Sequence, residues 1–384
     1  MHEREKRLKT IFFIIPSLSG GGAERVMLHI LKYIDRKKVK PYLILFEKRG
    51  ELLSDLPLDV NIAVLRKQGE SLFEHFIFIR FAKLLKKEKP DAVVSFMWYA
   101  NLVTILAKFL SGVKCGIVVS ERTSIIPYEG WFVRFMRSLT IRFFYPKATK
   151  IIVNSRSMSL ILSKMSNISA SKIAIINNPI DIRNINHMSI EDVIHPLYQE
   201  KIPIIITIGR LSFEKGFSYL LRALHIVAAD GISCRLVILG EGVEKQKLKR
   251  WVMKLGIDDK AIFLGFQKNP YKYLAHSTVF VLSSLYEGFP NVLLEALALG
   301  VPAIATRCPT GPEEIITNEV NGILVPPADE RALADAIKRL LLDEDLRKRL
   351  GEAGKRRAED FSIDKIIKQY EDVIENVCAE SAVK

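Results

Sequence analysis

Short β-branched runs alternate with helical patterns along the whole chain, and this alternation constrains the fold more than any other feature. Runs such as Thr10–Ile15 and Ile204–Ile208 have the length of buried strands, and amphipathic patterns such as Phe217–Ala229 separate them. Alternating strands and helices form parallel βαβ units. The other expected strands are Pro41–Phe46, Ile62–Val64, Ala92–Phe96, Gly116–Ser120, Lys150–Val153, Arg235–Leu239, Ile262–Leu264, Val279–Leu282, Ala303–Ala305 and Gly322–Val325. We therefore expect an α/β fold with doubly wound parallel sheets.

The length of 384 residues is too great for one typical hydrophobic core, so two domains are expected. The polar, proline-bounded stretch Ser189 to Pro203 is the expected linker. This gives a first domain of residues 1–195 and a second of residues 196–360.

The charge is unevenly divided between the two halves. Residues 1–195 carry 31 Lys and Arg against 17 Asp and Glu, which is +14, whereas residues 196–384 carry 26 of each. The whole positive excess lies in the first half, which therefore favours an anionic partner there. The chain contains no RNA- or DNA-binding motif, so we expect no nucleic acid partner.

The cysteines and the apolar runs limit the compartment. The four cysteines are scattered without CxxC or histidine pairing, which is typical of a reducing cytoplasm and argues against a zinc site. The first nine residues are mostly charged, which argues against a signal peptide, and no run of eighteen apolar residues that could span a membrane occurs. We expect a cytoplasmic protein that is soluble or peripheral to a membrane.

Two carboxylates, Glu287 and Glu295, stand eight positions apart around Gly288 and Pro290, after a buried strand. A strand that turns into a helix in this way leaves backbone N–H groups pointing into a crevice. Carboxylates at such a place can accept hydrogen bonds from sugar or ribose hydroxyls. A glutamate that interacts with the helix dipole would explain one of them, but not both. The segment predicts a nucleotide-sugar pocket.

Two further loops follow strands and can contact phosphates. Arg210 and Lys215 can clamp a diphosphate without a metal ion, although the alternative is a pair of solvated surface charges. The Gly20–Gly22 loop allows close approach of a ligand to the backbone, but tight strand–helix turns also use glycine. Neither a dinucleotide fingerprint nor a P-loop is present.

Together these motifs resemble the retaining glycosyltransferases of family GT4. The elements that carry the resemblance are Gly20-Gly21-Gly22-Ala23-Glu24-Arg25, Gly209-Arg210-Leu211 with Lys215-Gly216, Gly240-Glu241-Gly242, Leu264-Gly265-Phe266 and Glu287 through Glu295. The resemblance implies the GT-B fold, in which two Rossmann-like, doubly wound domains face each other across a cleft. It also implies that the C-terminal helix, within residues 361–384, crosses back to the first domain.

The resemblance also implies roles for single residues. Arg210 and Lys215 would bind the donor diphosphate in place of a metal ion, so neither a metal nor a cofactor is expected. Glu287, the third catalytic residue, would lie beside the transferred sugar, and Glu295 would hold the ribose hydroxyls. The other donor contacts it implies are Gly20, Gly21, Gly22, Gly265, Phe266, Gly288, Phe289, Asn291, Val292 and Leu293.

The acceptor side is predicted from three segments of the first half. Ser120-Glu121-Arg122-Thr123 resembles the N-E-R-T-like element of GT4 enzymes that extend lipid-linked glycans, with Ser in place of Asn. Glu121 would bind a sugar, and the alternative is a Glu–Arg pair in a loop. The segments 71–89 and 131–144 are basic and amphipathic, which favours an anionic membrane surface, although each could instead pack on its own domain. The acceptor diphosphate is expected at Arg80, Lys83, Lys86 and Lys87.

The sequence therefore predicts transfer of a hexose or N-acetylhexosamine from a nucleotide sugar, expected to be UDP-linked, to a polyprenyl-diphosphate-linked glycan. The enzyme would act on cell-surface polysaccharide or glycoprotein glycan synthesis at the inner face of the cell membrane. The alternatives are a GT4 enzyme that uses GDP-mannose or a lipopolysaccharide core acceptor, a sugar-nucleotide 2-epimerase of the same fold, and a non-catalytic scaffold that binds a nucleotide sugar.

Overall fold

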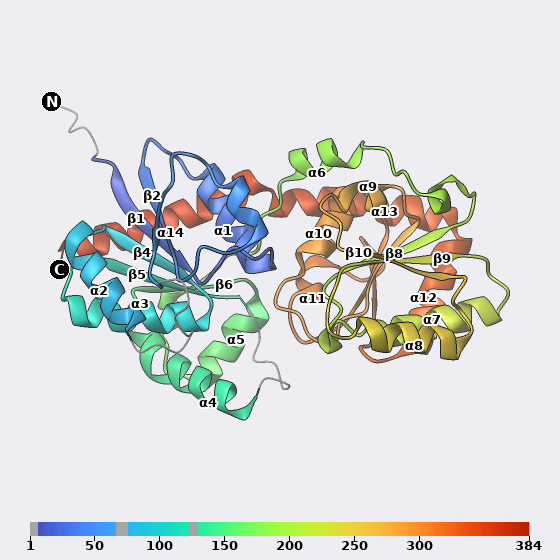
Figure 1. Cartoon of the computed structure of the whole chain (residues 1–384), viewed down its shortest axis with the longest axis horizontal. Coiled ribbons are helices and arrows are strands. Elements are labelled where there is room, and N and C mark those ends of the chain that lie inside the picture. The colour runs from blue at the N-terminus through green and yellow to red at the C-terminus, as the bar shows by residue number, and fades with distance from the viewer. Residues whose placement is uncertain (1–6, 67–75, 123–129, 384) are drawn as a thin grey trace. The chain divides into compact units, whose positions relative to one another are not determined.

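The chain forms two compact units, each built around one parallel sheet (Figure 1). The computed structural model describes residues 7–66, 76–122 and 130–383. Unit 1 comprises Met1–Pro179 with Ile363–Lys384, and unit 2 comprises Ile180–Ser362. The boundary expected after residue 195 thus differs from the observed division, because residues 180–195 belong to unit 2.

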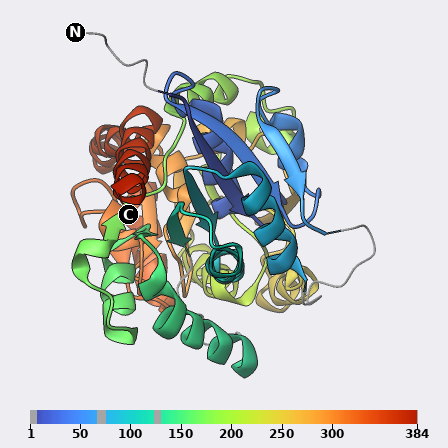
Figure 2. The ribbon, with the colours of Figure 1, turned by 90° about the vertical axis from the view of Figure 1, so that its left-hand side faces the viewer.

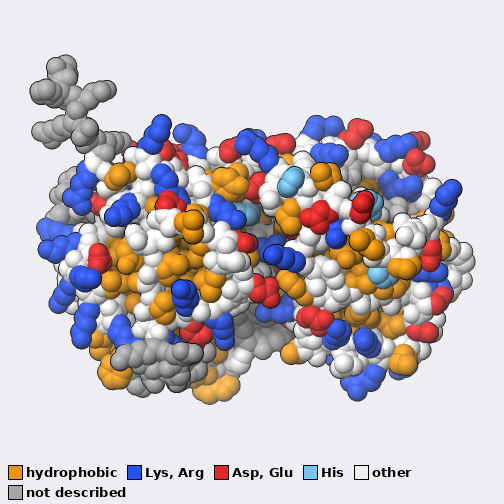
Figure 3. All heavy atoms as spheres, turned by 45° about the horizontal axis from the view of Figure 1, so that its top comes forward, with side chains coloured by type: hydrophobic (Ala, Val, Ile, Leu, Met, Phe, Trp, Pro, Cys, Tyr) orange, Lys and Arg blue, Asp and Glu red, His pale blue; other side chains and the backbone are white. Residues whose placement is uncertain are grey.

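The charge asymmetry holds for these units. Unit 1 contains 33 Lys and Arg against 19 Asp and Glu, and unit 2 contains 24 of each. Figure 3 shows Lys and Arg side chains gathered at the left-hand edge of the molecule, on unit 1, whereas both signs are mixed over unit 2. The positive excess is therefore a property of one folded unit.

Unit 1 contains seven parallel strands in the order β3-β2-β1-β4-β5-β6-β7, with the order reversing between β1 and β4. Six of these strands were predicted, whereas β7 has only three residues and was missed. The strands are β1 Lys9–Ile15, β2 Val39–Leu45, β3 Asn61–Val64, β4 Ala92–Phe96, β5 Gly116–Glu121, β6 Lys150–Val153 and β7 Ile173–Ile175. The helices are α1 Gly22–Tyr33, α2 Ile77–Glu88, α3 Trp98–Ser111, α4 Trp131–Leu139, α5 Arg156–Met165 and α14 Ile363–Val383.

Both faces of the unit 1 sheet are buried, which is why its strands are continuous apolar runs. Side chains alternate along β1, so that Phe13 packs with α1 and α14 on one face and Phe12 packs with α2, α3 and α5 on the other. Figure 2 shows α14, in red, lying along one side of this sheet. The C-terminal helix is therefore part of the core of unit 1.

Unit 2 contains six parallel strands in the order β10-β9-β8-β11-β12-β13. Its strands, all predicted within two residues at each end, are β8 Ile204–Ile208, β9 Arg235–Leu239, β10 Ala261–Gly265, β11 Val279–Leu282, β12 Ala303–Thr306 and β13 Ile323–Val325. Its helices are α6 Ile182–Ser189, α7 Phe217–Ala229, α8 Lys245–Leu255, α9 Tyr271–Ala275, α10 Asn291–Ala298, α11 Pro312–Ile315, α12 Glu330–Leu342 and α13 Glu344–Ala358. Helices α7, α8 and α12 cover one face of the sheet, and α6, α9 and α10 cover the other.

Several helices begin at side chains that satisfy the first free amides. The side chains of Ser155, Asp181, Asp329 and Asp343 accept hydrogen bonds from amides in the first turns of α5, α6, α12 and α13. Glycines in the left-handed conformation end α3 and α8, at Gly112 and Gly256. Across the described ranges, no helix combines the length and the apolarity that crossing a bilayer requires.

Candidate active site

The loops that follow β8, β9 and β10 are joined into one layer at the carboxyl edge of the unit 2 sheet. The amides of Gly209, Leu211 and Gly240 donate to the carbonyls of Leu239, Glu241 and Gly265 at 3.0, 2.8 and 2.8 Å. Gly240 has a φ of +137°, and a β-carbon there would overlap the Gly209 carbonyl. The glycines of these motifs therefore serve close backbone packing that a larger residue would prevent.

Lys215 and Glu287 meet in this layer, although 72 positions separate them in the chain. Their Nζ and Oε1 atoms are 2.6 Å apart, and both side chains are largely buried. Ser284, at the end of β11, donates from Oγ to the same carboxylate oxygen at 2.7 Å. The strand-end loops of β8 and β11 thus bring together one cation and one carboxylate.

The backbone around this pair is fixed by contacts that the sequence motifs do not reveal. Ser283 donates from Oγ to the Lys215 carbonyl at 3.0 Å, and a β-carbon at Gly216, which has a φ of +63°, would overlap the Ser283 carbonyl. On the other side, the Thr310 hydroxyl donates to the Glu287 carbonyl. Ser283, Ser284 and Thr310 therefore hold the ion pair in place. Serine and threonine are common in loops, so their role could not be inferred from the sequence.

The thiol of Cys308 lies within the electrostatic reach of this pair. Burial, followed by the negative charge of Glu287, raises its pKa to about 12, and Lys215 opposes the shift. Cys308 is therefore a neutral, apolar wall of the layer at physiological pH.

The other predicted donor residues differ in accessibility. Arg210 and Phe266 are exposed at the strand ends, and no ion pair to Arg210 is found in the part of the chain that is described. Glu295 is buried on α10, and Phe289, which precedes this helix, is buried as well. The Leu293 amide donates to the Pro290 carbonyl at 3.1 Å, so it is used inside the first turn of the helix. Among the other predicted donor residues, Gly288, Asn291 and Val292 are partly exposed.

In unit 1, the Gly20–Gly22 loop follows β1 and leads into α1, as the sequence predicts. Gly20 has a φ of +96° with open space around its α-carbon. Leu18, two residues before Gly20, is hydrogen-bonded to the backbone of Arg49 and Leu52. A β-carbon at Gly50 would overlap the Leu18 carbonyl, so this glycine allows the two loops to pack together.

Glu121 lies at the end of β5, fully buried, with both carboxylate oxygens occupied. Arg137 of α4 donates to Oε1 at 2.8 Å, and the Tyr145 hydroxyl donates to Oε2 at 2.5 Å. Burial, followed by the charge of Glu121, raises the pKa of Tyr145 well above its ordinary value, so the phenol stays protonated. Asn101 extends the network by donating to the Tyr145 oxygen at 2.8 Å.

Glu121 therefore forms a Glu–Arg pair, as in the alternative drawn from the sequence. Its partner is Arg137, which the sequence did not suggest, rather than Arg122. The neighbouring Arg122 instead donates to the Tyr370 hydroxyl of α14 at 2.7 Å and to Asn178 Oδ1 at 2.6 Å. Its guanidinium also lies 4.8 Å from the centre of the Phe96 ring. The fourth residue of the predicted element, Thr123, lies outside the described residues.

The two basic amphipathic segments use their apolar faces differently. The buried residues of α2, including Phe81 and Leu85, pack in the core of unit 1, so the alternative of packing on its own domain holds there. Residues 71–75 of that segment lie outside the described residues. In α4, by contrast, Arg137 is the buried residue, and Trp131 is 79% exposed. Figures 1 and 2 both show α4 extending from the lower edge of unit 1.

Of the expected acceptor residues, Lys83, Lys86 and Lys87 are exposed on α2. Arg80 is partly buried, and its Nη1 donates to the Leu65 carbonyl at 3.0 Å. The three lysines therefore form an accessible cationic row, and Arg80 fixes the start of the helix to the end of β3.

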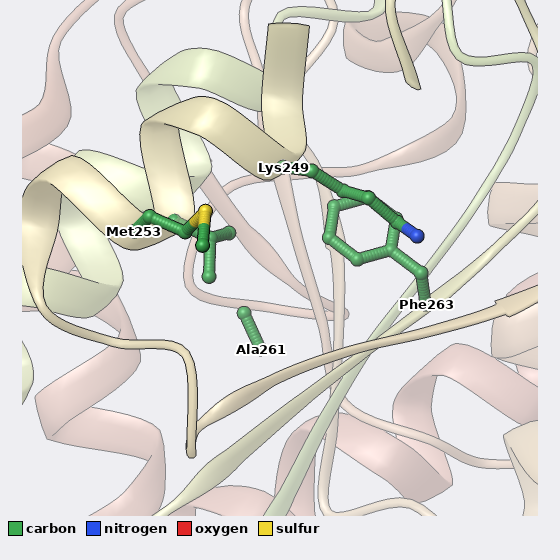
Figure 4. A pocket seen from close by; sticks show the side chains of 5 residues that line it. Lys249, Met253, Ala261 and Phe263 are labelled. Atoms are coloured by element: carbon green, nitrogen blue, oxygen red, sulfur yellow. The ribbon is translucent and has the colours of Figure 1, made fainter. Parts of the chain in front are cut away.

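A hollow of about 340 Å³ lies away from these loops, beside α8 at the start of β10. It is lined by Lys249, Val252, Met253, Ala261 and Phe263 (Figure 4). Apolar side chains line most of it, and it is at the opposite end of β10 from Gly265. It therefore takes no part in the layer that holds Lys215 and Glu287.

The chain matches two families that cover most of its length. Residues 20–184 match the family described as Glycosyltransferase Family 4, and residues 191–357 match the family described as Glycosyl transferases group 1. It is 31% identical over 367 residues to the N-acetylgalactosamine-N,N'-diacetylbacillosaminyl-diphospho-undecaprenol 4-alpha-N-acetylgalactosaminyltransferase of Campylobacter jejuni, covering 94% of this chain and 97% of that protein. It is also 30% identical over 394 residues to the uncharacterized glycosyltransferase MJ1059 of Methanocaldococcus jannaschii, covering 90% and 95%.

The fold is that of solved glycosyltransferases. The structure of Anabaena HepE in complex with UDP and glucose superposes with a TM-score of 0.81 at 21% identity, covering 96% of this chain and all of that one. Two Rossmann-like units with these strand-end motifs define a glycosyltransferase with the GT-B fold. The chain belongs to glycosyltransferase family 4. Membership in this family sets aside the epimerase and the scaffold alternatives.

Proposed function

We propose that this glycosyltransferase transfers a hexose or N-acetylhexosamine from a UDP-sugar to a polyprenyl-diphosphate-linked glycan, with retention at the anomeric carbon. The observation that carries the proposal is the largely buried Lys215–Glu287 pair at the carboxyl edge of the unit 2 sheet, where the loop after β8 also carries the exposed Arg210. Ligands of such sheets bind beyond the carboxyl ends of the strands.

The chemistry follows from the charges in that layer. Arg210 and Lys215 stabilise the negative charge that develops on the diphosphate as its bond to the anomeric carbon breaks. The new glycosidic bond forms from the acceptor hydroxyl oxygen on the same face, and the hydroxyl proton passes to a departing diphosphate oxygen. Glu287 orients Lys215 and meets the hydroxyls of the transferred sugar, and Glu295 binds the ribose.

Substitution of Lys215 by Ala tests this assignment. Removal of one preorganised charge from a developing anion lowers kcat by about 10²–10³-fold. The matched control is Lys348→Ala, because Lys348 also pairs with a glutamate, Glu344, at 2.8 Å but on an exposed face of α13. Equal activity of the two variants, measured as UDP release, would contradict the role of Lys215.

The stereochemistry and the donor require separate measurements. The three-bond H1–H2 coupling of the product distinguishes retention from inversion, and an inverted product would overturn the mechanism. A panel of UDP- and GDP-linked sugars identifies the donor. Activity only with GDP-mannose, or only on a lipopolysaccharide core acceptor, would favour the alternatives that the sequence left open.

A lipid-linked acceptor is supported by the Campylobacter relative, whose name specifies a diphospho-undecaprenol substrate. The cationic row on α2 supplies charge for the acceptor diphosphate. Reversal of Lys83, Lys86 and Lys87 to Glu should weaken use of a polyprenyl-diphosphate acceptor while the Km for the donor stays unchanged. An unchanged acceptor Km would remove this row from the proposal.

Contact with an anionic membrane surface is the second part of the proposal, and α4 is the element that fits it. Phe132 and Phe135 are exposed beside Trp131 on this helix. On α3, Phe109 is 79% exposed and has the ammonium group of Lys147 5.3 Å from its ring centre. Aromatic side chains flanked by cations bind the interface of an anionic bilayer. The enzyme would then act at the inner face of the cell membrane.

Co-sedimentation with vesicles tests this contact. Trp131→Ser with Phe132→Ser should reduce binding to vesicles of phosphatidylcholine with phosphatidylglycerol. The matched control is Val243→Ser with Leu342→Ser, because both residues are exposed apolar side chains of the neutral unit 2. Unchanged binding of the α4 variant, or an equal loss in the control, would contradict the proposal.

A further inference from the structure

Two adjacent serines follow β11, and each contacts one member of the Lys215–Glu287 pair. Ser283 donates from Oγ to the Lys215 carbonyl at 3.0 Å, and Ser284 donates from Oγ to Oε1 of Glu287 at 2.7 Å. Their exposed fractions are 2% and 1%, so both serines are buried. The fold, rather than the solvent, therefore sets the direction of each hydroxyl.

Ser284 is held from both neighbouring strands of the sheet. Strand β11 lies between β8 and β12. The Ser284 carbonyl accepts a hydrogen bond from the hydroxyl of Thr306, the last residue of β12. On the other side, the amide of Leu285 donates to the carbonyl of Glu214 at 2.8 Å, in the loop after β8. The hydroxyl is thus in position before any ligand binds, which is what preorganisation requires.

Two donors converge on one carboxylate oxygen. Nζ of Lys215 and Oγ of Ser284 both donate to Oε1 of Glu287, at 2.6 and 2.7 Å. An ammonium group has three N–H donors, and a carboxylate oxygen can accept more than one hydrogen bond. Across residues 7–66, 76–122 and 130–383, Glu287 is the one acceptor found for the Lys215 ammonium. Two of its N–H donors therefore stay available for the oxygens of a ligand.

The hydroxyl of Ser284 changes how strongly the carboxylate holds this ammonium. Hydrogen bonds between charged groups are short and strong, so an unshared carboxylate draws a lysine toward itself. The positive end of the O–H dipole beside Oε1 offsets part of the negative charge that the ammonium feels. The side chain of Lys215 is 21% exposed, so a ligand can reach it. Sharing of Oε1 therefore leaves the ammonium freer to meet a phosphate oxygen.

We propose that Ser284 is a positioning residue for the transfer reaction. Its hydroxyl shares the charge of Glu287 and thereby keeps the Lys215 ammonium available to the diphosphate of the donor. The inference rests on the proposed function, because that function is what brings a diphosphate to Lys215. Ser284 contacts no reacting atom and acts through the ion pair alone.

Steady-state kinetics of Ser284→Ala test this role, with the donor that the panel of UDP- and GDP-sugars identifies. The kcat should fall at least about tenfold, because a hydrogen bond to a charged group is lost. The Km for the donor should change by less than about threefold, since the affected contact is with charge that develops in the transition state. An unchanged kcat, or a loss that falls on the donor Km alone, would overturn the proposal.

Two further variants separate the hydrogen bond from packing. Ser284→Cys keeps a side chain of similar shape but donates weakly, so it should be as slow as Ser284→Ala. Wild-type activity of Ser284→Cys would mean that the serine only fills space. The matched control is Ser277→Ala, because Ser277 also donates at 2.7 Å, to the Tyr273 carbonyl, but precedes the opposite end of β11. An equal loss in this control would also reject the role. If Ser284→Ala proves unstable in urea, Ser284→Cys decides the question.

A double-mutant cycle with Lys215→Ala separates this inference from the proposed function. If Ser284 acts through the cation, Ser284→Ala should lower kcat no further once Lys215 is Ala. Losses that multiply would show that the serine acts by another route and would refute the proposal. A large loss in Lys215→Ala with full activity of Ser284→Ala would reject the positioning role and keep the function. Full activity of Lys215→Ala would reject both.

Discussion

The buried pair between Glu121 and Arg137 gives the sharpest test of how α4 is held. Arg137→Met removes the cation while keeping a long side chain, and leaves Glu121 with a hydrogen bond from Tyr145 alone. Both members of the pair are 1% exposed, so the carboxylate cannot regain water without local opening. Removal of one partner from a buried pair costs about 3–5 kcal/mol.

A double-mutant cycle separates that penalty from the net worth of the pair. Neutralising both residues, as Glu121→Gln with Arg137→Met, should cost less than Arg137→Met alone, because no unpaired charge stays buried. The matched control is Arg134→Met, the same substitution at an exposed position of the same helix, which should change stability by less than about 0.5 kcal/mol.

Hydrogen exchange is the suitable assay, because it reports local opening and does not require the two units to unfold in one cooperative transition. Amides of residues 131–139 should lose protection in Arg137→Met, recover part of it in the double variant, and keep it in Arg134→Met. The pair does not hold α4 as the structure implies if Arg137→Met costs less than about 1 kcal/mol. The same holds if the costs of Glu121→Gln and Arg137→Met add up to the cost of the double variant.

Three further predictions concern other parts of the molecule. Because burial raises the pKa of the Cys308 thiol to about 12 and those of the other three cysteines to about 11, the native protein should scarcely react with Ellman's reagent at pH 8, whereas the unfolded chain should release four equivalents. Gly240→Ala should destabilise unit 2 by more than about 2 kcal/mol, seen as a lower urea midpoint, because its β-carbon would meet the Gly209 carbonyl at a positive φ. Hydrogen bonds from Arg339 lower the pKa of Glu319, so this pair stabilises the protein above the unfolded pKa of about 4.3 and loses its effect as the pH falls. Because the pair is exposed, Arg339→Gln should cost at most about 1 kcal/mol at pH 7 and nothing near pH 2; an equal cost at both pH values would contradict this account.

The sheets could be predicted from the sequence because buried parallel strands are apolar on both faces. Runs such as Phe280–Leu282 admit no other interpretation once helical patterns surround them. The strand β7 was missed although β13, which also has three residues, was predicted. Strand β7 lies at the edge of its sheet and its residues are only partly buried or exposed, so the signal of a strand buried on both faces does not apply to it.

The candidate site was predictable where its residues lie in compact motifs. Lys215 and Glu287 were both singled out, and the structure joins them directly. Their supports could not be foreseen, because Ser283 and Thr310 are common residues whose partners come from loops elsewhere in the chain. Hydrogen bonds between distant loops leave no local pattern.

Periodicity also could not distinguish the two basic helices. Both α2 and α4 have one apolar side with cations beside it, yet α2 buries that side and α4 exposes it. The difference lies in tertiary contacts: α2 packs in the core of unit 1, whereas α4 is tied to β5 through the pair of Arg137 with Glu121. Arg137 lies among the aromatic residues of α4 in the sequence, and the structure shows it as the buried residue that ties the helix to Glu121.

The place of α14 in the core of unit 1 has a consequence for how the chain is made. The ribosome synthesises residues 363–383 after all of unit 2, yet Ile366, Tyr370 and Val377 complete one face of the unit 1 sheet. Unit 2 is continuous and can fold as soon as it emerges, whereas the first unit to be synthesised waits for the last helix. During that interval an apolar face of the nascent sheet is open to chaperones and to other chains. The unit that is synthesised first is therefore the unit that completes its fold last.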